Sequence, residues 1–189
     1  MSSRRTLLIM ASMTLLASAV TPALAASATV KPAEELVDKA ANAFLDAVRN
    51  GSHREDFARV FDRYVSMEAI AMFALGKHRR RLPPDQRGDY VELVRTMLLN
   101  TVTKHGKQVR GRAFVVTGSR GSTVSGYIQH DGDRRADVDM RLAGGRIADI
   151  RVEGIWLAFI LRQEFNRIID NGNGDIAAIF DYLKRGAAL

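Results

Sequence analysis

The chain has 189 residues and carries a formal net charge of +7, from 28 basic and 21 acidic side chains. It contains no cysteine, which excludes disulfides, a thiolate metal centre and a cysteine nucleophile. A chain of this length is typical of one domain that buries its own core. The basic residues are scattered apart from one tract, so we do not expect a nucleic-acid partner.

The first 25 residues have the three-part order of a secretory signal peptide. Arg4 and Arg5 form a basic start, residues 6–20 form an apolar run, and Ala23-Leu24-Ala25 resembles a cleavage site. The run is shorter than a membrane span. We therefore expect residues 1–25 to be removed, and residues 26–189 to form a single domain in the periplasm. The sequence leaves the Sec and twin-arginine export routes open.

Four helices are predicted in the first half of the remaining chain. The first runs from Pro32 to Arg49, the second follows a capping box at residues 52–55, and the third runs from Met67 to Leu75. Pro83 and Pro84 open a fourth helix that ends at Gly106. Each helix has apolar residues at helical spacing along one face.

The period then changes to two residues, which predicts strands over 113–119, 122–130, 135–142 and 146–152. Ala148, Ile150 and Val152 are expected to share the core face of the last strand. Short turns join the strands, so they should form an antiparallel meander. A largely apolar helix and a shorter second one follow. The fold class is therefore α+β, with helices packed on a curved antiparallel sheet of about four strands.

No catalytic or metal-binding motif is recognisable in this sequence. The four histidines are far apart, and the loop from Asp170 to Asp175 lacks the acid pattern of a calcium loop. An enzyme would need an inward carboxylate with a raised pKa, and the strand period points Asp149 away from the core. The tract Lys77–Arg81 suits a lipid headgroup or an acidic partner, or is simply a solvated loop.

Three segments resemble the MlaC-type (toluene-tolerance) family of periplasmic lipid carriers. They are residues 61–76, residues 85–87 with the helix that follows, and residues 149–165, which include Val152-Glu153-Gly154. The resemblance implies an NTF2-like fold with an apolar cavity, a monomer without catalytic activity, and no cofactor apart from bound lipid. It also implies transport of phospholipid between an inner-membrane ABC transporter complex and an outer-membrane lipoprotein complex. The alternatives are an NTF2-like cavity enzyme and a non-catalytic interaction module of an envelope complex.

The C-terminal segment departs from the family pattern in a way that leaves the cargo open. Trp156 stands where the family usually has Ser, and Ile160-Leu161 replaces an Asn-Tyr pair. Because these changes make the helix more apolar, a hopanoid-like polycyclic lipid is an alternative to phospholipid.

The resemblance also indicates which residues would contact lipid. Arg162 would bind a phosphate, or would instead pair with Asp149 or Glu153. The expected lipid-binding residues are Phe44, Phe61, Tyr64, Phe73, Leu98, Val138, Met140, Ile150, Trp156, Phe159, Arg162 and Phe165.

Overall fold

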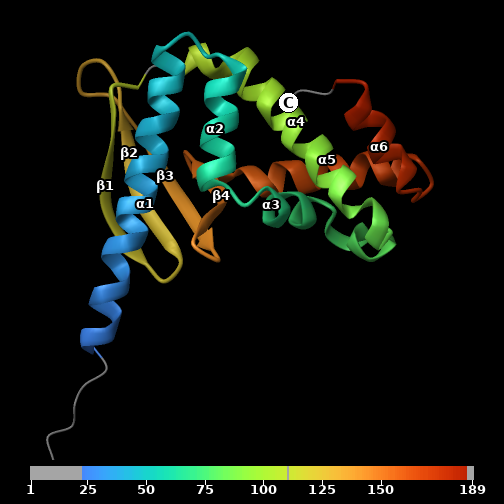
Figure 1. Ribbon diagram of the computed structural model, residues 1–189, viewed down its shortest axis with the longest axis horizontal. Coiled ribbons are helices and arrows are strands. Elements are labelled where there is room, and N and C mark those ends of the chain that lie inside the picture. Colours follow the sequence, from blue (N-terminus) through green and yellow to red (C-terminus); the bar gives the residue numbers. More distant parts are fainter. Residues whose placement is uncertain (1–22, 110, 187–189) are drawn as a thin grey trace, which may run out of the picture.

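The computed structural model describes residues 23–109 and 111–186 (Figure 1). Most of the predicted signal peptide, residues 1–22, lies outside the described residues. Within the described ranges, no helix combines the length and apolar character needed to cross a bilayer. The helices are α1 (Ala23–Arg49), α2 (Arg54–Tyr64), α3 (Met67–Ala74), α4 (Arg87–His105), α5 (Leu157–Asn171) and α6 (Ala177–Lys184), with short 3₁₀ turns η1 (Gly76–Arg81), η2 (Pro84–Gln86) and η3 (Gly106–Gln108).

The first two helix starts differ from their predictions. Helix α1 begins at Ala23 rather than Pro32, because an alanine-rich segment with high helix propensity extends it past the proline. The predicted capping box is also absent. His53 is the N-cap of α2 and makes no side-chain cap bond, while Ser52 has a positive φ of 61°. The predicted third and fourth helices correspond to α3 and α4.

The sheet confirms the predicted α+β class. Its strands are β1 (Ala113–Arg120), β2 (Thr123–Gln129), β3 (Arg135–Ala143), β4 (Arg146–Val152) and β5 (Ile155–Trp156). They lie in sequence order and pair antiparallel. The fifth strand was not predicted. Glu153 and Gly154, both at positive φ, make a two-residue turn that pairs Ile155 with Val152.

Strand β4 contains a bulge that corrects its predicted pattern. Arg141 pairs with Asp149 but Leu142 pairs with Ile147, so Ala148 is the extra residue. Ile147, which is 2% exposed, therefore packs in the same apolar cluster that Ile150 contacts. Of the predicted face of Ala148, Ile150 and Val152, only Ile150 and Val152 lie on the side of Met140 and Val138. Ile147 takes the place of Ala148, because the bulge shifts the alternation by one residue.

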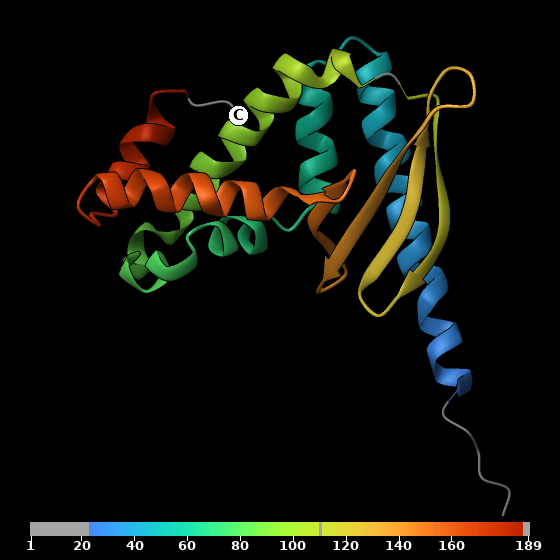
Figure 2. The same ribbon diagram turned by 180° about the vertical axis from the view of Figure 1, so that it is seen from behind.

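The apolar side chains form two separate clusters. One lies between α1 and the sheet and includes Val37, Leu45, Phe114 and Val138. The other joins α2 to α6 and includes Tyr90. Figures 1 and 2 show α1 along one face of the sheet, the opposite face of β1 to β3 without a covering helix, and α3 to α6 extending to one side. The molecule therefore has a sheet half and a helical half.

Candidate functional site

Most of the predicted lipid-binding residues are packed in the two clusters. Those in or against the helical cluster are Phe44, Phe61, Leu98 and Phe165, and those in or against the sheet cluster are Tyr64, Val138, Met140 and Ile150. The hollows described at the surface are lined by none of Val138, Met140 and Ile150. A cavity between sheet and helices therefore stays a prediction.

The edge of the sheet at β4 and β5 leaves apolar side chains open to solvent. Val138 is 2% exposed and pairs across the sheet with Val152, which is 43% exposed. Val152 pairs in turn with Ile155, which is 58% exposed. Directly paired residues lie on the same face of a sheet. The row Val138–Val152–Ile155 therefore carries the apolar face from the core out to the surface.

The start of α5 extends this exposed surface. Its buried face is formed by Ala158, Leu161 and Phe165, whereas Phe159 and Ile160 are 53% and 41% exposed. We name the exposed set Val152, Ile155, Phe159 and Ile160 the β5–α5 strip. Single exposed apolar residues are ordinary, but several on one short segment mark a candidate interaction site.

Arg162 lies beside this strip and joins it to α3. Its guanidinium lies 5.2 Å from the centre of the Phe73 ring, and Phe73 is itself 43% exposed. Arg162 and Phe159 line one shallow hollow of about 320 Å³, together with Lys77. The structure thus brings together three predicted residues, Phe73, Phe159 and Arg162, and adds a second cation.

Trp156 lies on the opposite face of the sheet from Ile155, its neighbour in the chain. The guanidinium groups of Arg141 and Arg151 lie 4.2 Å and 5.0 Å from the centre of its ring. Arg151 also donates to Asp139 over 2.7 Å. Burial raises the pKa of Asp139, but hydrogen bonds from Ser125 and Arg151 outweigh it and hold that pKa below its ordinary value. These contacts hold β5 to the sheet and leave Trp156 partly exposed.

Asp149 is buried, although the strand period predicts a solvent-facing side chain. The bulge keeps it on the face of Arg141, away from α1, but the start of α5 covers that face here. One carboxylate oxygen accepts from the backbone N–H groups of Ile150, at 2.9 Å, and Ala158, at 3.0 Å. Burial is the largest influence and raises the pKa of Asp149.

The alternative pairing expected for Arg162 is not formed. Asp149 has Arg141 as its nearest cation, at 4.0 Å, and Glu153 accepts the backbone N–H of Asp137 at 2.8 Å. Arg162 instead packs between Phe73 and Gly76. In the described ranges no three His, Cys, Asp or Glu side chains gather into a group suited to a metal ion.

The strip could be found only in part from the sequence. Of its residues, the sequence predicts lipid contact for Phe159 and a core position for Val152, and it does not single out Ile155. The unpredicted β5 strand is the reason, because its pairing places both residues on an uncovered edge.

The sheet is an antiparallel meander that a long helix covers on one face, and an apolar strip lies where the sheet meets the helical half. This arrangement is that of a small α+β binding protein. A model of the family described as MlaC protein matches residues 33–185. The chain belongs to this family, as the resemblance of its three segments predicted.

The fold is also found in a solved structure, that of a phospholipid-binding protein from Ralstonia solanacearum in complex with a phospholipid. The two chains superpose with a TM-score of 0.68 and are 16% identical, over 81% of this chain and 95% of the other. This likeness confirms the fold, with helices on a curved open sheet. No curated protein matches the chain.

Proposed function

We propose that this protein binds phospholipid and carries it through the periplasm. The observation that carries the proposal is the membership in the MlaC family over residues 33–185, together with the exposed β5–α5 strip. The related fold of the Ralstonia protein, which holds a phospholipid, supports it.

In this proposal the acyl chains lie against the strip. Each methylene group removed from water contributes about 0.8 kcal/mol. A bilayer offers nearly the same gain, so the protein needs only to compete with a membrane and can release the lipid again. Ile155 and Phe159 are the most exposed members of the strip and would make the first contacts. Arg162, held beside Phe159, is placed to meet a phosphate group.

The export signal in residues 1–25 supports a periplasmic location. The partners in this proposal are an inner-membrane ABC transporter complex and an outer-membrane lipoprotein complex, between which a carrier would shuttle.

Peptide-mass analysis of the protein from a periplasmic fraction tests the location. We expect a mature chain that starts at or near Ala26, and a chain that keeps Met1 would contradict it.

Asp149 meets one requirement of the rival hypothesis, an enzyme, because it is buried and its pKa is raised. Its contacts favour a structural role, since one of its oxygens holds the first turn of α5 against β4. None of the surface hollows described contains Asp149. Lipid binding is therefore the function that this arrangement supports best.

Uptake of a fluorescent phospholipid tests the proposal. Donor vesicles that contain the labelled lipid are mixed with the protein, and the two are then separated by flotation. We expect labelled lipid in the protein fraction, and a labelled hopanoid-like lipid in a parallel tube tests the alternative cargo. Label that stays with the vesicles in both tubes would contradict lipid binding.

A further inference from the structure

The 3₁₀ turn η1 divides its basic side chains into two sets. In a 3₁₀ helix, residues three apart lie above one another. His78 and Arg81 accordingly reach the C-terminal end of α5 and the loop that follows it. His78, 3% exposed, contacts Asp170 at 3.0 Å, and Arg81 donates to the carbonyl oxygen of Gly174 at 2.5 Å. These two contacts hold the turn in place.

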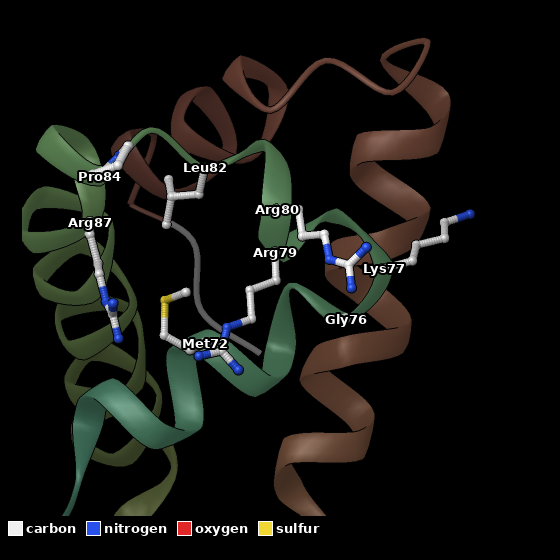
Figure 3. A pocket seen from close by; sticks show the side chains of 8 residues that line it. All are labelled: Met72, Gly76, Lys77, Arg79, Arg80, Leu82, Pro84 and Arg87. Atoms are coloured by element: carbon white, nitrogen blue, oxygen red, sulfur yellow. The ribbon is translucent and has the colours of Figure 1, made fainter.

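The remaining cations of η1 point outward from this held turn. Arg79 and Arg80 line a hollow of about 660 Å³ together with Met72 and Leu82. Lys77 also lines it, and the end of its side chain extends away toward α5 (Figure 3). Lys77 is paired with Asp170 at 2.7 Å. Among the described residues, Arg79 and Arg80 have neither an ion pair nor a ring contact.

Exposed aromatic side chains lie next to these cations. Phe73 precedes η1 on α3 and is 43% exposed, and Phe159 shares a shallow hollow with Lys77. Aromatic rings beside basic side chains are typical of surfaces that rest on a lipid headgroup layer. We name Phe73, Lys77, Arg79 and Arg80 the η1 face.

The positions of the arginine side chains distinguish a site for one anion from a surface that meets many phosphate groups. Arg87, on the opposite wall of the hollow from Arg79, is already paired with Glu68. Arg79 and Arg80 line the same hollow, but their guanidinium groups lie apart, so they do not converge on one phosphate group (Figure 3). A layer of many phosphates satisfies both at once.

We propose that the η1 face docks this protein on the surface of an anionic lipid bilayer. The proposal goes beyond lipid binding and does not depend on it, because it concerns the outside of a membrane rather than a lipid carried by the protein. Docking would hold the β5–α5 strip close to the headgroup layer, since Phe159 and Lys77 line one hollow.

Co-sedimentation with vesicles tests the proposal on the full mature chain. The vesicles contain either phosphatidylcholine alone or equal parts of phosphatidylcholine and phosphatidylglycerol. We expect binding to the anionic vesicles only, and weaker binding as salt is added. The double variant Arg79→Glu with Arg80→Glu should bind at least about tenfold more weakly. Each basic residue near an anionic surface raises the affinity by about fivefold.

A matched control carries the same change of charge elsewhere. Arg120 and Arg134 are exposed, also lack an ion pair among the described residues, and lie on the sheet half. The variant Arg120→Glu with Arg134→Glu should bind within about twofold of the wild type. The pair Arg79→Gln with Arg80→Gln repeats the test, should charge reversal disturb folding.

Native mass spectrometry of both double variants separates this proposal from the proposed function. Lipid adducts that persist in the Arg79/Arg80 variant, together with lost vesicle binding, support the docking surface. Equal losses in both double variants would overturn it, as would wild-type binding that the η1 substitutions leave unchanged. Absence of wild-type binding to anionic vesicles would also overturn it and would leave this face to an acidic protein partner.

Discussion

At the scale of single residues, Asp149 shows how a buried carboxylate can hold a helix against a strand. It stands on a strand whose alternation is shifted by one residue, and its oxygen meets the second backbone N–H of α5. A carboxylate at this end of a helix also meets the positive end of the helix dipole. Burial nevertheless dominates and raises its pKa.

Replacing Asp149 by Asn should make the protein less sensitive to pH. A raised pKa means that the folded protein binds more protons than the unfolded chain, from the ordinary pKa of 3.8 up to the raised value. Wild-type stability should therefore fall relative to Asp149→Asn as the pH rises through this window, and the difference should then level off. Urea unfolding of both proteins at a series of pH values measures it.

The amide oxygen of Asn still accepts the two N–H bonds, so Asp149→Ala serves as the control for the cap. We expect this control to be about 1 kcal/mol less stable than Asp149→Asn at every pH. A difference between wild type and Asp149→Asn that is constant with pH would contradict the assigned shift.

Gly76 is the second residue on which the site depends. It has a φ of +55°, and a Cβ there would lie 2.7 Å from Nε of Arg162. Gly76→Ala should lower the free energy of unfolding by about 1–2 kcal/mol, the cost of a left-handed conformation. Thermal unfolding measures the loss. Gly144→Ala, also at positive φ but with open space around it, separates the backbone cost from the contact with Arg162.

At the scale of elements, the β4–β5 hairpin decides what is exposed. Val138 and Val152 are neighbours on one row, yet α1 and its cluster cover the first and leave the second open. The two-residue strand β5 extends that open row by Ile155 before the chain enters α5.

Replacing Val152 and Ile155 by Ser should lower lipid uptake and leave the fold intact. Both side chains are about half exposed, so their loss should change the free energy of unfolding by less than about 1 kcal/mol. The fluorescent-phospholipid uptake assay and a thermal melt of the same sample measure the two effects. Unchanged uptake by a folded variant would show that lipid does not contact the strip.

At the scale of the whole molecule, two apolar clusters divide the interior into a sheet half and a helical half, and a cavity between sheet and helices stays a prediction. The α+β class, the helices α2 to α6 and the antiparallel sheet follow from hydrophobic period and turn residues, and were predicted. The bulge at Ala148 and the strand at Ile155 were not, because each depends on pairing between strands rather than on local pattern. The exposed strip escaped prediction for the same reason, since exposure depends on which face α1 covers.

The variant Val138→Trp tests whether the sheet half of the molecule is closely packed. Val138 is 2% exposed within a cluster, so Val138→Trp should overpack it and lower the free energy of unfolding by about 1–3 kcal/mol. Denaturant unfolding measures this loss. A folded variant of wild-type stability that no longer takes up lipid would instead show that the sheet and α1 enclose an open cavity.

The central claim is that the protein carries phospholipid, and native mass spectrometry tests it most directly. The full-length precursor is expressed, and the mature chain is purified from the periplasm without detergent and sprayed under gentle conditions. We predict a population heavier than the bare chain by the mass of one phospholipid, which solvent extraction then identifies. A protein that consistently appears at its bare mass, and stays so after incubation with phospholipid vesicles, would contradict the claim.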